Sequence, residues 1–169
     1  MNTLHTILHY LSAAVFIYLA ANALYLFIIA LGGRLIRGKK FSVHPEKKKI
    51  SVLIPCFKED LIILDTASRS AEHDYPKDRL TITVIADKLK PATVATLRQV
   101  PVNVLEVDLN MKSRSLHAAL ETMRGLDTEI VMILDADNIM GAGCLEKVND
   151  AFQQGYTAVQ CHRTAKNKN

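Results

Sequence analysis

The sequence contains little cysteine. Its three cysteines, Cys56, Cys144 and Cys161, are an odd number and include no C-x-x-C pair. This argues against a disulfide framework and against a zinc site, and it fits a reduced, cytosolic environment. Internal repeats and low-complexity segments are also missing. With 49% hydrophobic and 22% charged residues in 169, the chain has room for a membrane segment and about one soluble domain.

Residues 11–31 lack charged side chains, and Ser12 and Asn22 are their only strongly polar members. A helix of this length would be about 30 Å long, which is the thickness of a bilayer's hydrocarbon core. The run is too long for the apolar region of a signal peptide, and no basic segment precedes it. We predict a transmembrane signal anchor over residues 1–33. The alternative is a buried core helix.

Positive charge is concentrated just after this run, while the rest of the chain is near neutral despite the formal charge of +4. A membrane-proximal cluster explains this better than binding of nucleic acid. The positive-inside rule then places the N-terminus outside and the remainder in the cytoplasm, as a single-pass protein of the inner (cytoplasmic) membrane. Residues 34–49 are predicted to be a basic juxtamembrane linker, either lying along the anionic leaflet or simply solvated. Its basic residues are Arg34, Arg37, Lys39, Lys40, Lys47, Lys48 and Lys49.

From residue 50 the sequence alternates between strand-like and helix-like segments. Strands are expected at residues 50–54, 80–86, 102–107, 130–134 and 157–161, the first ended by Pro55. Helices are expected at residues 60–71, 91–100, 113–124 and 144–153. Such alternation with short connections predicts right-handed crossovers and a mostly parallel, three-layer α/β sheet over residues 50–169.

The fourth expected strand runs directly into two carboxylates, Asp135 and Asp137. A continuous apolar run suits a strand that is covered on both faces, and ligands of such sheets bind outside the carboxyl ends of the strands. Two acids one residue apart can share a hard divalent cation such as Mg²⁺, with substrate phosphates completing the site. Alternatively, these residues only end the strand and cap the next helix.

Other strand ends also carry polar residues. Glu59 and Asp60 follow the first strand, Asp87 the second and Lys112 the third. Each has a simpler explanation, because acids favour the first turn of a helix, Asp87 could form a turn and Lys112 could be a solvated surface residue. Their coincidence on one sheet edge favours a binding site.

Taken in order, these motifs resemble the family 2 glycosyltransferases. These are nucleotide-sugar-dependent enzymes of the GT-A fold that include cellulose, chitin and hyaluronan synthases. The resemblance covers residues 49–168. S-V-L-I-P-C-F-K-E-D resembles the family's V-I-P-A-Y-N-E opening, and V-I-A-D resembles its V-V-D-D strand end. K-S-R-S-L-H-A-A-L resembles G-K-x-x-A-L-N, D-A-D matches the D-x-D motif, and Q-C-H-R-T-A-K-N resembles the segment beyond it.

The chain departs from the family pattern in places. Lys58 and His117 stand where asparagine is usual, Ala86 replaces the first acid of V-V-D-D, and Lys88-Leu89 replaces its glycine-serine tail. The identity of the nucleotide base is therefore open.

The resemblance implies roles for individual residues. Asp87 would contact the base, Lys112 would approach the diphosphate, and Asp135 would orient the metal or the ribose. Asp137, with Asp135, would hold the divalent cation, Mg²⁺ or Mn²⁺. The implied donor-binding residues are Pro55, Phe57, Glu59, Asp87, Lys112 and Asp135.

The function implied is a membrane-anchored, inverting glycosyltransferase that transfers a sugar from a nucleotide-diphosphate sugar, expected to be a UDP-sugar, to a glycan or lipid-linked acceptor. The family places its general base in an E-D or T-E-D motif further on, so we expect that base beyond Asn169 and the donor-binding half here. Glu146 and Asp150 are expected to be solvated. One alternative is a non-catalytic nucleotide-sugar binder. Another is a nucleotidyltransferase, although its usual glycine-rich loop after the first strand is missing.

Overall fold

The computed structural model describes residues 3–35 and 41–164 of the chain. The chain divides into two compact units, residues 1–40 and 41–169, which are described separately. Residues 36–40 of the linker predicted at 34–49 lie outside the described part.

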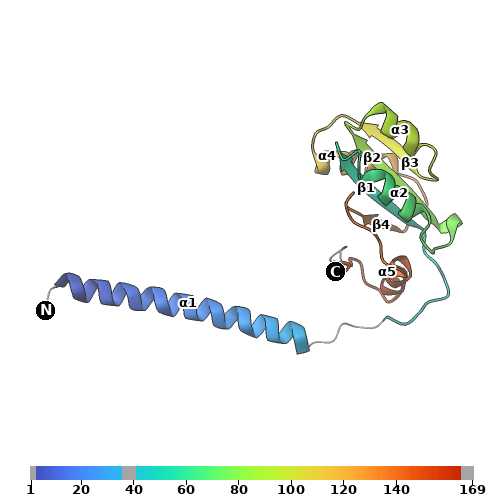
Figure 1. Ribbon diagram of the computed structural model, residues 1–169. Coiled ribbons are helices and arrows are strands. Elements are labelled where there is room, and N and C mark those ends of the chain that lie inside the picture. Colours follow the sequence, from blue (N-terminus) through green and yellow to red (C-terminus); the bar gives the residue numbers. More distant parts are fainter. Residues whose placement is uncertain (1–2, 36–40, 165–169) are drawn as a thin grey trace. The chain divides into compact units, whose positions relative to one another are not determined.

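The first unit is one helix, α1 (Thr3–Leu35), which extends beyond the predicted apolar run at both ends (Figure 1). Two of its polar side chains bond to carbonyls of the same helix. Ser12 Oγ donates to the His9 carbonyl at 2.9 Å, and Asn22 Nδ2 to the Tyr18 carbonyl at 2.8 Å. The helix therefore presents an apolar surface with its internal polar groups satisfied. Within the described residues, α1 is the one helix long and apolar enough to be a candidate membrane span.

The second unit is built on a parallel sheet. Its strands are β1 (Ile50–Phe57), β2 (Leu80–Asp87), β3 (Asn103–Val107) and β4 (Ile130–Ile133), in the order β3-β2-β1-β4. Ile50 lies opposite both Leu80 and Ile130, so β1, β2 and β4 start at matched positions, and β3 runs parallel beside β2 from Asn103, opposite Thr83. Their carboxyl ends consequently lie along one edge. This arrangement confirms the predicted parallel α/β sheet.

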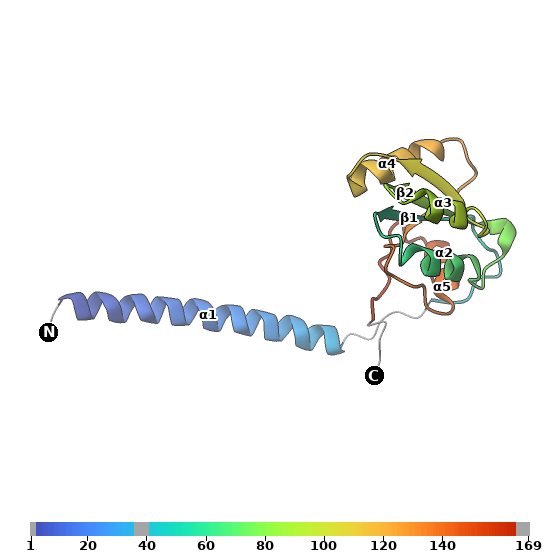
Figure 2. The same ribbon diagram turned by 45° about the horizontal axis from the view of Figure 1, so that its top comes forward.

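Helices cover both faces of the sheet. They are α2 (Ile63–Ala71), α3 (Pro91–Leu97), α4 (Lys112–Thr122) and α5 (Cys144–Gln153), and a short 3₁₀ turn, η1, covers Lys77–Arg79. Figure 2 shows α4 on one side of the strands and α2 and α5 on the other.

The alternation of side chains along the strands explains these layers. Val52 and Ile54 of β1 belong to a core shared with Ile63, Leu97 and Leu145 of α2, α3 and α5. The intervening Leu53, with Ile85 of β2, packs with Ala119 of α4 in a second core. Each such side chain is 1% exposed or less, and burying one of the valine, leucine or isoleucine side chains stabilises the fold by about 1.5–3 kcal/mol.

Pro55 does not end the first strand as predicted, because β1 continues to Phe57. The carbonyl of Leu53 accepts from the Leu134 N–H on the β4 side, and backbone groups alternate sides along a strand. Pro55 therefore turns its missing N–H toward the β4 side. Pairing with β4 stops at Leu53 while pairing with β2 continues to Phe57, so the proline removes no ladder hydrogen bond.

The fifth strand expected at residues 157–161 is not formed, and that prediction is wrong for the described structure. These residues are exposed and pair with no strand among the described residues. Their local β-like pattern was the basis of the prediction. A strand also requires a partner edge, and that is a long-range property.

Candidate functional site

A cavity of about 280 Å³ lies at the carboxyl edge of the sheet. Every site residue assigned from the sequence lines it: Pro55, Phe57, Glu59, Asp87, Lys112, Asp135 and Asp137. The lining also includes three residues to which the sequence assigned no binding role, namely Cys56, Ser115 and Ala136. The fold therefore brings together the ends of β1, β2 and β4 and the start of α4.

Asp135 is surrounded by cations. Lys112 pairs with its Oδ1 and Arg163 with its Oδ2, and Asn138 Nδ2 donates to Oδ2 at 3.4 Å. The Lys112 hydrogen bond is the main cause that holds the pKa of Asp135 below its ordinary value, and Arg163 adds to it. Arg163 was not assigned a role from the sequence, because nothing local indicates that it reaches a residue 28 positions earlier.

Asp137 is placed differently. Its side chain is exposed and makes no hydrogen bond or ion pair to any described residue. Ala136, between the two acids, is 3% exposed, and its carbonyl accepts a hydrogen bond of 2.6 Å from Thr66 Oγ1 on α2. The buried Ala136 anchors the segment and leaves both carboxylates lining the cavity.

Asp87, at the end of β2, is 2% exposed and fixed by α4 and the loop before it. Ser115 Oγ donates to its Oδ2 at 3.1 Å, and the Leu109 N–H donates to its Oδ1 at 3.3 Å. Each carboxylate oxygen has a second lone pair, so Asp87 retains acceptor capacity at the cavity wall.

The loop after β1 is tied to β2, because the Lys58 N–H donates to the Asp87 carbonyl at 3.1 Å. Lys58 has a φ of 56° and Lys88, directly after β2, a φ of 57°. Asn110, in the loop after β3, has a φ of 53°. Non-glycine residues seldom adopt this left-handed conformation. Here it turns three successive connections sharply at the edge that holds the cavity.

Phe57, the last residue of β1, and Glu59, in the loop that follows, are both exposed. The Phe57 side chain is covered on one face by Lys58, whose Nζ lies 5.0 Å from the ring centroid. The Glu59 carbonyl accepts hydrogen bonds from the N–H groups of Ile62 and Ile63, which forms the turn into α2. Asp60 instead binds the start of α3, accepting from the Lys90 N–H at 2.8 Å. A hydrogen bond from the Thr93 side chain is the main cause that lowers the pKa of Asp60.

Residues 45–169 match the model of a family described as glycosyltransferase like family 2. The chain belongs to this family. The resemblance noted in the sequence is thereby confirmed.

Among solved structures, this family 2 chain is similar to a mannosyltransferase from Pyrobaculum calidifontis, PcManGT, in complex with GDP-Man and Mn²⁺. The TM-score is 0.55 and the sequence identity 25%. The match covers 67% of this chain and 36% of that one, so the chain spans little more than a third of this relative. Together with the parallel sheet, it supports a GT-A-like fold. No curated protein matches the chain.

The carboxylates of the family 2 site can accept a divalent cation of the hard, oxygen-binding type. Asp137 is open, and Asp135 lies on the same cavity wall. The described residues contain no group of three or more metal-ligating side chains. A metal here would therefore use the two carboxylates and complete its coordination with substrate phosphates or water, as Mg²⁺ commonly does.

The expectation that Asp150 is solvated is wrong. Asp150, on α5, is 4% exposed, and its Oδ1 accepts from the His44 N–H at 2.9 Å. Glu146 is half-buried, and one of its carboxylate oxygens is buried without a hydrogen-bond partner among the described residues. Neither residue lines the cavity at the carboxyl edge. Asp150 is buried because the segment before β1 packs along α5.

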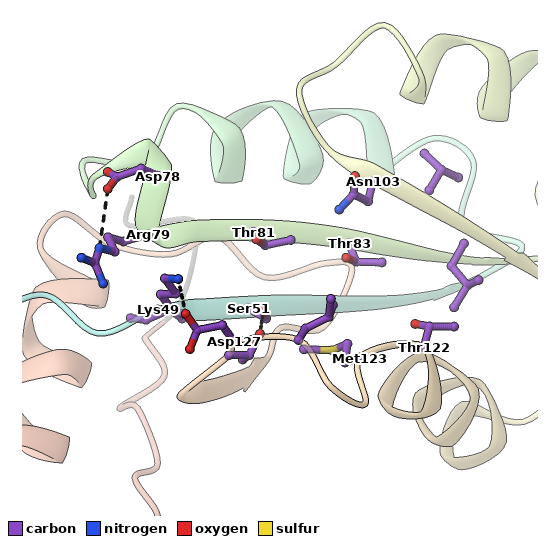
Figure 3. Close-up of a pocket in the computed structure, with 15 residues that line it drawn as sticks. Lys49, Ser51, Asp78, Arg79, Thr81, Thr83, Asn103, Thr122, Met123 and Asp127 are labelled. Carbon is purple, nitrogen blue, oxygen red and sulfur yellow. Dashed lines mark hydrogen bonds and ion pairs between the residues drawn. The ribbon is translucent and has the colours of Figure 1, made fainter.

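A second cavity, of about 460 Å³, lies near the amino end of the strands (Figure 3). Its charged residues already have partners, Lys49 with Asp127 and Arg79 with Asp78. Ser51 and Thr128 are hydrogen-bonded to each other at 2.9 Å. None of the assigned motif residues lines this cavity, so the smaller cavity is the candidate site.

Proposed function

We propose that the second unit binds the nucleotide-sugar donor of a membrane-anchored, inverting glycosyltransferase. The observation that carries the proposal is the convergence of Asp87, Lys112, Asp135 and Asp137 on one cavity in a chain of this family. We further propose that a glycan or lipid-linked molecule is the acceptor. The general base that deprotonates this acceptor is proposed to come from outside residues 41–164.

The roles follow from the chemistry of the donor. When the bond between sugar and phosphate breaks, negative charge develops on the diphosphate leaving group. A divalent cation, Mg²⁺ or Mn²⁺, supplies Lewis-acid stabilisation of that charge when bound. Asp137 and Asp135 would hold it, and Lys112 would place a second positive charge beside the phosphates. Asp87 would accept a hydrogen bond from the base.

The proposed donor is a UDP-sugar. The solved relative was captured with GDP-Man and Mn²⁺, which supports the broader class of a nucleotide-sugar with a divalent cation. It also makes GDP the natural competitor of UDP in a binding test.

The proposed location is the inner (cytoplasmic) membrane, with residues 1–33 as anchor, residues 34–49 as basic linker and residues 50–169 as part of the catalytic domain. The apolar surface of α1 and the basic residue in its last turn, Arg34, support this arrangement. Under the positive-inside rule the N-terminus lies outside and the second unit faces the cytoplasm.

Calorimetry on the full chain in detergent tests the proposal, with UDP and GDP titrated in the presence of Mn²⁺, Mg²⁺ or a chelator. We expect UDP to bind only with a metal, and Asp137→Asn to weaken that binding at least about tenfold. Asp74→Asn is the matched control, because Asp74 is an exposed acid outside the cavity. Metal-dependent binding that survives Asp137→Asn would overturn the assigned role. Binding of neither nucleotide would overturn the function.

A further inference from the structure

Asp135 receives two cations from segments far apart in the chain. Lys112 is the first residue of α4, and Arg163 lies beyond α5. Each occupies a different oxygen of the carboxylate. The side chain of Asp135 is 26% exposed, whereas those of Lys112 and Arg163 are 56% and 73% exposed. The carboxylate is thus held in the cavity wall, while the two cations are largely solvated and can change partner.

The neighbouring Asp137 shows none of this neutralisation. Its carboxylate is exposed and makes no pair with any described residue, so the two acids of the D-A-D motif differ in electrostatic state. A divalent cation on both carboxylates would lie beside Lys112 and Arg163 and be repelled by them. These residues therefore compete with a metal for Asp135 unless an anion neutralises them.

A diphosphate is an anion of the right kind. Guanidinium groups bind phosphate oxygens through paired N–H donors, and lysine binds them as a point charge. We propose that Arg163 is a donor-binding residue. With Lys112 it forms a pair of cations that rests on Asp135 when the site is empty and transfers to the donor's diphosphate when metal and nucleotide bind. The inference rests on the proposed function and adds to the donor site a residue from beyond α5.

This exchange predicts that removing Arg163 changes the affinity for Mn²⁺ and the affinity for the nucleoside diphosphate in opposite directions. Without Arg163, Mn²⁺ alone has one competitor fewer for Asp135. Since an exposed ion pair is weak, we expect Mn²⁺ to bind about two- to fivefold more tightly. The nucleoside diphosphate loses a charge-assisted contact, so it should bind about tenfold more weakly at saturating Mn²⁺. A residue with only a structural role would weaken both ligands together.

The experiment uses the full chain in detergent. Mn²⁺ is titrated alone and followed by the electron paramagnetic resonance of the free ion, and UDP and GDP are then titrated calorimetrically at saturating Mn²⁺. The variants are Arg163→Gln and Arg163→Lys, and we expect the lysine variant, which keeps the charge, to fall between wild type and Arg163→Gln. Arg124→Gln is the matched control, because Arg124 is an exposed arginine paired with Glu121 at 2.8 Å and is expected to change neither affinity.

Tighter Mn²⁺ binding together with weaker diphosphate binding in Arg163→Gln supports the inference. An unchanged diphosphate affinity, or a parallel loss of both, overturns it and leaves the proposed function intact. A wild-type chain that binds neither UDP nor GDP overturns the proposed function and this inference with it.

Discussion

Thr66 Oγ1 donates a buried hydrogen bond of 2.6 Å to the carbonyl of Ala136, the residue between the two acids of the D-A-D motif. Thr66 itself is 1% exposed. The bond joins α2 to the loop after β4 and so fixes the backbone from which Asp135 and Asp137 project. A residue outside the cavity therefore controls the positions of the candidate metal ligands.

Replacing this hydroxyl should loosen the metal site. In Thr66→Val the Ala136 carbonyl stays buried without its donor, so we expect the free energy of unfolding to fall by about 1–3 kcal/mol. Metal-dependent nucleotide binding should weaken as well. Denaturant unfolding and calorimetry on the full chain in detergent measure the two effects. Thr96→Val is the control, since Thr96 bonds to the Ala92 carbonyl at 3.0 Å on an exposed helix surface. Equal losses in both variants would contradict the prediction.

The segment before β1 depends in the same way on Asn149, which is fully buried on α5. Its Oδ1 accepts from the Lys48 N–H at 2.9 Å, and its Nδ2 donates to the Glu46 carbonyl at 3.1 Å. Asn149→Leu leaves both backbone groups without this partner, so we expect a loss of about 2–4 kcal/mol in unfolding free energy. Residues 41–49 should also become more susceptible to protease.

Gln153→Ala provides the comparison, because Gln153 donates to the same Glu46 carbonyl at 3.3 Å through a solvent-exposed hydrogen bond. Water can replace that bond, so the expected change is within about 0.5 kcal/mol. If Asn149→Leu were as mild as this control, the segment would not depend on α5 for its position.

Part of the fold and of the candidate site could be predicted from short stretches of the sequence. Apolar runs such as the one in β4 identified the strands, and the rule for parallel sheets placed their carboxyl ends, with Asp87 and Asp135, at one edge. Both inferences use properties of a few consecutive residues and a general rule of topology.

The features that sequence did not predict depend on distant partners. Pro55 was expected to end a strand. It does not, because the pairing of β1 with β4 stops at Leu53, and local sequence does not reveal where that pairing stops. Asp150 was expected to be solvated. It is buried because it contacts a segment 106 residues earlier, which its neighbours in the sequence do not reveal. Arg163 reaches Asp135 from beyond α5. No periodicity within a window of ten or so residues encodes such pairings.

A titration at acid pH should show the effect of Lys112 and Arg163 on the pKa of Asp135. Lys112 and Arg163 hold the pKa of Asp135 below its ordinary value of 3.8. Because the pKa is lower in the folded state, these pairs stabilise the fold above about pH 3.8, and their contribution is lost as the pH falls through the folded value. Lys112→Gln should therefore raise the pKa of Asp135 toward 3.8, and Arg163→Gln should raise it less.

Carbon-13 NMR titration of the Asp135 carboxyl in the full chain measures this pKa directly. Arg124→Gln, which removes an arginine paired with Glu121, should leave it where it is in wild type. A pKa that Lys112→Gln does not move would show that Lys112 does not pair with Asp135 in solution.

The native cysteines allow the proposed membrane orientation to be tested without adding a label site. Cys161 is exposed, whereas Cys56 is buried and Cys144 half-buried. Burial raises the pKa of both the Cys56 and the Cys144 thiol to about 12. Maleimides react with the thiolate, so at neutral pH Cys161 should take up nearly all of a membrane-impermeant maleimide. We expect labelling in inverted membrane vesicles and none in right-side-out vesicles, because the second unit should face the cytoplasm.

Cys161→Ser should abolish the rapid labelling in inverted vesicles, and detergent should restore labelling of the wild type in right-side-out ones. Labelling of Cys161 in intact right-side-out vesicles would contradict the positive-inside orientation. Release of the chain from the membrane by a carbonate wash would contradict the anchor itself, because an apolar helix of the length of α1 stays in the bilayer when peripheral contacts are broken.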